Sequence, residues 1–202
     1  MTTSAADRAP SRLTPALKRR AVREAIDFLV EREGLSATQR AQLEAVPVRW
    51  RRRRGRSKFY LGAAHGHAGP HVLLTVGRGA ESRWHTYRRV RAGLTTPPGG
   101  IPMPTAMYAT VVLVHEFTHA LQHGVCGTPK RRYSEVETTD NEIEFVRRVA
   151  PQLHAQLVPV QGDKARRVKA RPRAASARVA RGGDGGASGL IGWLWKLIAP
   201  RA

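Results

Sequence analysis

Two histidines four residues apart, His115 and His119, lie within a long apolar segment of the chain. Residues four apart lie on the same face of an α-helix, so both imidazoles can reach one metal ion. Burial of two histidines and Glu116 in an apolar helix is unfavourable unless these polar groups have partners. The pattern HExxH at residues 115–119 therefore predicts an apolar helix that carries a metal site.

The same spacing predicts a chemistry. Zinc binds neutral imidazole nitrogens at about 2.0–2.1 Å, and a catalytic zinc ion keeps one position open for water. Glu116 directly follows the first histidine, so its carboxylate can take a proton from that water and return it to a leaving amine. We therefore expect one Zn²⁺ per chain, with His115 and His119 as ligands and Glu116 as the general base.

A third ligand is expected from the next helix, because His123 lies two turns from His115, about 12 Å along the helix axis. That helix is rich in carboxylates, which are Glu135, Glu137, Asp140, Glu142 and Glu144. Acidic residues in a first helical turn are also favoured by the helix dipole alone. A helical-wheel count places Glu135 and Glu142 nearer the apolar face than Glu137, so all three stay open as ligands.

These motifs resemble the gluzincin metallopeptidases, in which HExxH is followed by a helix with the pattern E-x-x-x-[DN]. Glu137 and Asn141 have that spacing, and residues 119–122 resemble the H-x-x-Q continuation of some bacterial HExxH families. The likeness is closer to the compact bacterial minigluzincins, including the ImmA/IrrE-like peptidases, over about residues 70–151. The resemblance implies Glu137 as the third zinc ligand and Asn141 as a support for a histidine ligand.

The resemblance also implies a function. It is that of a zinc metallopeptidase, a hydrolase whose substrate is a protein or peptide. Tyr133 and His154 are candidates for stabilising an oxyanion in such a site. Two other functions stay open: a zincin-like, nucleic-acid-associated binding protein without turnover, and a secreted metallopeptidase toxin. Glu116 favours the enzyme, because a purely structural zinc site needs no general base.

The order of patterns predicts an α+β, zincin-like fold. It consists of an N-terminal helical pair, a small, mostly antiparallel sheet, the HExxH helix and a ligand-bearing helix. The run of residues 71–76 is the clearest strand, either an edge strand that pairs with an extended substrate or a core strand. Helix N-caps are predicted at Thr14, Ser36, Thr105 and Ser134.

Five divisions of the chain are expected. They are a flexible tail at 1–12, the helical pair at 13–46, the metallopeptidase core at 47–161, a basic disordered linker at 162–188 and an apolar segment at 189–202. The linker is mostly Arg, Ala, Gly and Ser, which cannot form a packed core. The apolar segment is too short to span a bilayer and is expected to dock on a partner or a membrane surface.

Positive charge exceeds negative charge strongly, with 35 Lys and Arg against 15 Asp and Glu and a formal net charge of +20. The segment from Arg49 to Lys58 and the run 164–181 concentrate this charge. We expect them to contact nucleic acid or another polyanion without reading its sequence. An arginine-rich composition with no such partner is the alternative.

The expected location is cytoplasmic. The single Cys126 cannot form an internal disulfide, and the first ten residues lack the apolar core of a secretory signal. Some export routes use no cleaved signal, so the toxin alternative stays compatible with this N-terminus.

Overall fold

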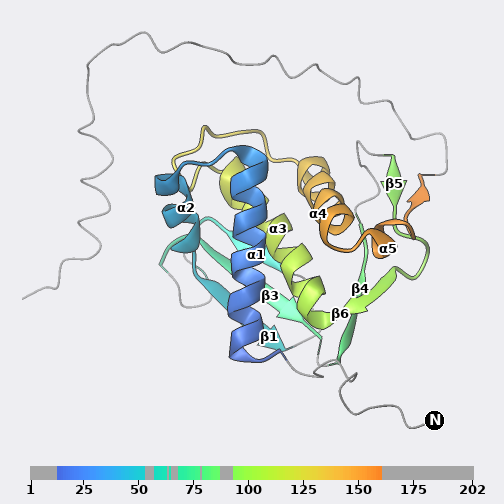
Figure 1. Ribbon diagram of the computed structural model, residues 1–202. Coiled ribbons are helices and arrows are strands. Elements are labelled where there is room, and N and C mark those ends of the chain that lie inside the picture. Colours follow the sequence, from blue (N-terminus) through green and yellow to red (C-terminus); the bar gives the residue numbers. More distant parts are fainter. Residues whose placement is uncertain are drawn as a thin grey trace, which may run out of the picture. The chain divides into compact units, whose positions relative to one another are not determined.

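The computed structural model describes residues 13–52, 57–62, 64, 68–77, 79–86 and 93–160 (Figure 1). The predicted tail at 1–12, linker at 162–188, basic run at 164–181 and apolar segment at 189–202 lie outside these residues. So does the centre of the basic segment, residues 53–56.

The two N-terminal helices begin at the N-caps that the sequence predicts. Helix α1 (Pro15–Glu33) is capped by the Thr14 side chain, which accepts a hydrogen bond from Leu17 N, and it ends at Gly34 with φ 64°. Helix α2 (Ala37–Glu44) begins with a complete capping box between Ser36 and Gln39. In both cases the side chain satisfies an amide that the first helical turn leaves unpaired.

A three-stranded sheet follows, with the strand order β1-β3-β2. Strands β1 (Val48–Arg52) and β3 (His71–Val76) are parallel, whereas β2 (Lys58–Tyr60) and β3 are antiparallel. Strand β3 is central and all six of its residues are buried. The interpretation of residues 71–76 as a substrate-pairing edge strand is therefore wrong, and β2 occupies that position in the described part of the sheet.

Two further strand pairs are short and antiparallel. Strand β4 (Glu81–Trp84) pairs with β6 (Ile101–Pro104), and β5 (Leu94–Thr95) pairs with β7 (Val158–Pro159). Among the described residues only β1 and β3 form a parallel pair. The fold is thus α+β with small sheets, as predicted.

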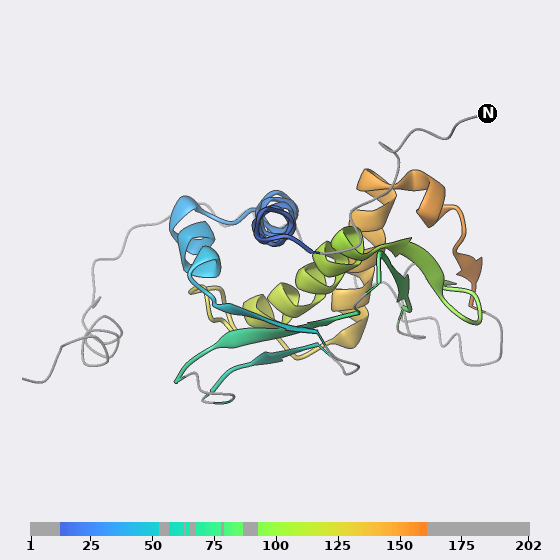
Figure 2. The same cartoon turned by 90° about the horizontal axis from the view of Figure 1, so that it is seen from below.

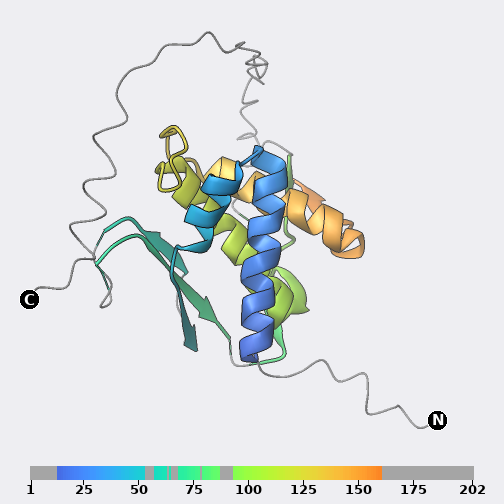
Figure 3. The same ribbon diagram turned by 60° about the vertical axis from the view of Figure 1, so that its left-hand side comes forward.

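Helix α3 (Thr105–Gln122) is the centre of the fold. In Figure 2 it lies between α1 and the three-stranded sheet, and Figure 3 shows the sheet and helix α4 (Glu135–Val149) on opposite sides of the central helices. A short helix, α5 (Pro151–His154), follows α4. One hydrophobic core includes buried residues of α1, the sheets, α3 and α4, so the N-terminal helical pair shares its core with the HExxH helix.

No helix in the described residues is both long enough and apolar enough to cross a membrane.

Candidate metal centre

The two histidines of the HExxH pattern face the same point. Their Nε2 atoms lie 3.1 Å apart, and the His119 side chain is 5% exposed. Helix α3 begins at Thr105, whose hydroxyl donates to Gly79 O instead of capping the helix as predicted. Buried apolar residues on both sides of the motif hold this helix in the core, so the two imidazoles are fixed on its polar strip.

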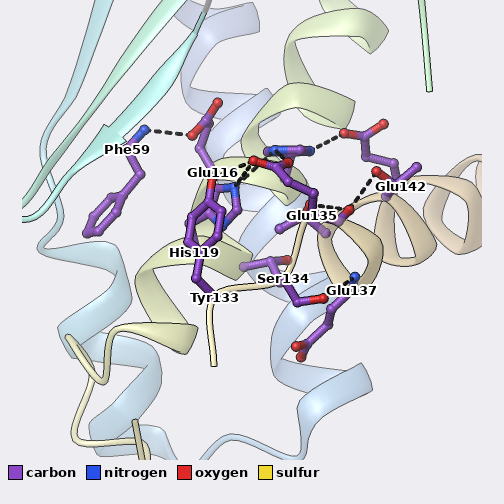
Figure 4. A network of polar contacts seen from close by, with 12 residues as sticks. Phe59, Glu116, His119, Tyr133, Ser134, Glu135, Glu137 and Glu142 are labelled. Atoms are coloured by element: carbon purple, nitrogen blue, oxygen red, sulfur yellow. Dashed lines mark hydrogen bonds and ion pairs between the residues drawn. The ribbon is translucent and has the colours of Figure 1, made fainter. Parts of the chain in front are cut away.

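Glu135 is the carboxylate that the structure places beside both histidines. Its Oε2 lies 3.2 Å from His115 Nε2, and its Oε1 lies 3.7 Å from His119 Nε2. Each of the three residues offers a ligand atom, and these atoms all lie within 4.8 Å of one another. The arrangement is drawn in Figure 4. One of the open alternatives for the third ligand, Glu135, thus joins the two predicted histidines.

Glu137, which the resemblance implied as the third ligand, has other partners. One carboxylate oxygen accepts a hydrogen bond from Gln122 Nε2 at 3.1 Å, and the other lies 2.8 Å from Arg131 Nη1. Ser134 caps α4, so Glu135 is the first helical residue. Each residue turns the helix by about 100°, so the side chain two positions on points to the opposite side of α4.

Glu142 lies on the same side of α4 as Glu135, because seven residues complete almost two turns. His115 Nδ1 donates to Glu142 Oε1 at 2.5 Å, and Trp84 Nε1 donates to Glu142 Oε2 at 2.9 Å. The Glu142 carboxylate is therefore held between α3 and β4. Its bond to Nδ1 fixes the ring of His115 and leaves Nε2 directed at Glu135 and His119.

Gln122 has the equivalent role for the second histidine. His119 Nδ1 donates to Gln122 Oε1 at 3.0 Å, and Gln122 Nε2 donates to Ser134 O at 3.1 Å. Gln122 is only 1% exposed. It joins the end of α3 to the cap of α4, so one amide orients His119 and places the helix that carries Glu135.

Asn141 does not contact either imidazole in the described hydrogen bonds. Its Oδ1 accepts from Arg32 Nε at 2.5 Å and its Nδ2 donates to Thr118 Oγ1 at 3.0 Å. The expected support of a histidine ligand comes from Glu142 instead. Asn141 connects α4 to α1 and α3 behind the site.

Aromatic rings cover one side of the histidines. The Tyr133 ring stacks on His119 with centroids 4.4 Å apart, and its hydroxyl donates to Glu135. The His123 ring lies 5.7 Å from the ring of Phe59, outside the group of three ligands. Tyr133 is thus next to the metal position as predicted, whereas none of the described contacts of the site involves His154.

The charges of the site suit a cation. Burial lowers the pKa of His119 to about 4, so this imidazole is neutral near pH 7. The hydrogen bond with His115 lowers the pKa of Glu135 to about 2. Burial lowers the pKa of His115, but the charge of Glu142 and hydrogen bonds to Glu135 and Glu142 outweigh burial and raise it to about 10. The metal-free site therefore keeps a proton on His115 that a metal ion would replace.

Glu116 lies beside this group without belonging to it. Its Oε2 accepts a hydrogen bond from Phe59 N at 2.6 Å, and burial raises the pKa of its carboxyl group to about 7. The Phe59 amide belongs to β2, so the carboxylate lies between α3 and the edge of the sheet (Figure 4).

Comparisons with known protein families, with curated proteins and with solved structures each find no match to this chain.

Proposed function

We propose that this chain is a zinc-dependent peptidase, with His115, His119 and Glu135 as the ligands of one Zn²⁺. Two imidazole nitrogens and one carboxylate are the donor set of many catalytic zinc sites. The hydrogen bonds of both Nδ1 atoms support this, because they leave both Nε2 atoms directed at one point. When bound, zinc would supply an activated water and a positive charge for the substrate carbonyl.

The position of Glu116 is the observation that carries the proposal. A structural zinc site has no use for a further carboxylate that lies beside the three ligands without binding the metal. In the metal-free protein burial raises the pKa of Glu116 to about 7, and a general base works best when its pKa lies near the working pH. Glu116 thus takes the proton of the attacking water and delivers it to the leaving amine.

Tyr133 is the residue best placed to assist. Its hydroxyl hydrogen-bonds Glu135 while its ring lies on His119, so it is next to two of the three proposed ligands. Tyr133 is 53% exposed, which leaves its side chain able to turn toward a substrate carbonyl. A hydrogen bond from this hydroxyl to a developing oxyanion would lower the barrier to nucleophilic attack.

The experiment that tests the enzyme is Glu116→Gln, which keeps the size of the side chain and removes the base. We expect hydrolysis of an unstructured protein to fall by about 10²–10⁴-fold, while bound zinc is retained. Glu144→Gln is the matched control, because Glu144 is an ion-pair partner of Arg147 and Arg148 on the far side of α4. It should cleave at the wild-type rate.

A binding protein without turnover would behave differently. Neither generic proteins nor proteins from extracts of the native cell would be hydrolysed in a way that depends on Glu116. Such a binding protein would bind DNA with the steep salt dependence of phosphate contacts. That pair of results would overturn the proposal.

A further inference from the structure

The backbone of Phe59 faces outward from the sheet and toward the site. Phe59 N donates to Glu116, and the residue opposite on β3, Val72, donates its N–H to Pro47 O. The two residues are therefore a pair without hydrogen bonds between them. In an antiparallel sheet, a residue of a non-hydrogen-bonded pair directs both its N–H and its C=O away from the partner strand. The Phe59 carbonyl therefore faces the outer edge of β2, where Glu116 lies.

The side chains of β2 alternate between two faces of the sheet. The Phe59 side chain is buried on the α3 side against His123. Lys58 is exposed and lies on the opposite, outer face, with its Nζ 5.4 Å from the centroid of the Tyr60 ring.

The outer face carries further positive charge. Arg49 on β1 and Lys58 on β2 both pair with Leu73 on β3, so the three residues form one row across the sheet. Paired residues point to the same face. Arg49 is also exposed. A row of two exposed cations thus runs along the outer face to the edge of the sheet beside the proposed general base.

We propose that this site takes acidic peptides, with an Asp or Glu side chain of the substrate beside Lys58. The inference rests on the proposed peptidase function and adds the class of its substrate. An extended peptide that adds to the outer edge of β2 places one residue beside Phe59, next to Glu116. The neighbouring residue lies beside Lys58, and its side chain falls on the basic outer face about 4.5–5.5 Å away.

A peptide fits this surface better than a nucleic acid. The outward carbonyl of Phe59 can accept a hydrogen bond from a peptide amide, and the strand geometry repeats the side-chain spacing of the sheet. Along this row, as far as the structure describes it, a nucleic acid would gain the charges of Arg49 and Lys58. The charged row and the outward-facing carbonyl of Phe59 meet at the same point, beside Glu116.

The test measures binding apart from hydrolysis. The full-length, zinc-loaded Glu116→Gln protein is titrated with fluorescent peptides in which Thr alternates with Glu, with Gln or with Lys. In every register that places one of these side chains beside Lys58, all of them face the outer side of the sheet. We expect the Glu peptide to bind at least about fivefold more tightly than the Gln peptide at low salt, and the Lys peptide most weakly.

Two further substitutions in that protein identify the cation. Lys58→Glu should reverse the order, so that the Lys peptide binds more tightly than the Glu peptide. Lys18→Glu is the matched control, since the Lys18 ammonium also lies over an aromatic ring, 5.3 Å from that of Trp50, and the change in charge is the same. It should leave the preference for the Glu peptide unchanged.

Equal binding of the Glu and Gln peptides, or equal effects of the two lysine substitutions, would overturn the inference. So would a single-stranded oligonucleotide that binds through Lys58 while the peptides do not. Hydrolysis of the Glu and Gln peptides by wild-type protein at the same kcat/KM would remove the acidic preference and leave the peptidase. A strong preference in binding, without any hydrolysis that depends on Glu116, would instead remove the proposed peptidase function.

Discussion

His115 Nδ1 lies 2.5 Å from Glu142 Oε1, and the other oxygen of that carboxylate holds the indole N–H of Trp84. Glu142 belongs to α4, as does Glu135 two turns earlier. One helix therefore provides both the carboxylate proposed as a metal ligand and the carboxylate that orients a histidine. The position of α4 against α3 and β4 thus determines the geometry of the whole site.

Glu142→Gln should weaken zinc binding by about 10–100-fold, after correction for the proton that zinc displaces from His115, because the amide no longer supplies the negative charge that orients and polarises the imidazole. The zinc affinity would be measured by competition with a chelator. Glu144→Gln, two residues along the same helix, should bind zinc as the wild type does. An unchanged affinity in Glu142→Gln would mean that the contact to His115 contributes only to packing.

Glu135→Ala should lose zinc far more completely than Glu137→Ala, because only the first removes a carboxylate next to both imidazoles. Glu137→Ala removes the partner of Arg131 and Gln122, so we expect a lower free energy of unfolding with zinc binding kept. Zinc content of the two purified proteins is the measurement. Loss of metal from the Glu137 variant alone would restore the ligand set that the gluzincin resemblance implies.

Helix ends could be predicted from the sequence because their causes are local. Thr14, Ser36 and Ser134 each accept a hydrogen bond from an amide three residues on. Such a cap depends on neighbours in the sequence and on little else. Thr105 differs, since its hydroxyl contacts Gly79 O and Ser82 Oγ, which lie on a different segment of the chain.

The third carboxylate could not be chosen from spacing alone. The resemblance favoured Glu137, but the rotation of α4 about its axis is set by packing against α3, which no local pattern specifies. The helical wheel did contain the relevant signal, since it placed Glu135 and Glu142 nearer the apolar face. Both of these residues, and not Glu137, lie against His115.

The central position of β3 also depends on contacts far apart in the sequence. Its parallel partner β1 lies before β2 in the chain, so the order β1-β3-β2 is not apparent from the run of residues 71–76. A signal was present, because four of these six residues are aliphatic, as is usual for a strand buried on both faces. The polar residues His71 and Thr75 interrupt this aliphatic pattern, although both are buried.

Gly100→Ala should destabilise the fold by at least about 1 kcal/mol, because Gly100 has φ 72° and a Cβ there would lie 2.7 Å from Trp84 O. The free energy of unfolding in urea, with a chelator present, is the measurement. Gly62→Ala is the control, since a Cβ at Gly62 meets no atom within 4 Å. Equal stability of the two variants would show that the β4–β6 connection relaxes without cost.

Zinc binding should release the proton that His115 holds in the metal-free protein. Three carboxylates face this imidazole, from Glu116, Glu135 and Glu142, and its pKa is raised to about 10. At pH 8 His115 is therefore protonated, whereas His119, with a pKa of about 4, and Glu135, with a pKa of about 2, carry no proton to lose. A zinc ligand must be neutral imidazole, so metal binding displaces about one proton from His115.

The sign of the pH dependence follows from this exchange. Zinc affinity should rise with pH by up to about tenfold per unit, and the rise should level off near the pKa of His115, about 10. Calorimetric titration at pH 8, in buffers with different enthalpies of ionisation, counts the protons released. Ionisation of zinc-bound water would add to that count, so the informative quantity is the difference between variants.

Glu142→Gln provides that difference. It removes the charge that raises the pKa of His115, so more of the imidazole is already neutral at pH 8 and fewer protons should be released than in the wild type. Zinc-bound water ionises in both proteins, so its contribution largely cancels. Glu144→Gln should release as many protons as the wild type. Equal proton release by the Glu142→Gln and wild-type proteins would show that Glu142 does not hold a proton on His115, and the electrostatic part of its proposed role would fail.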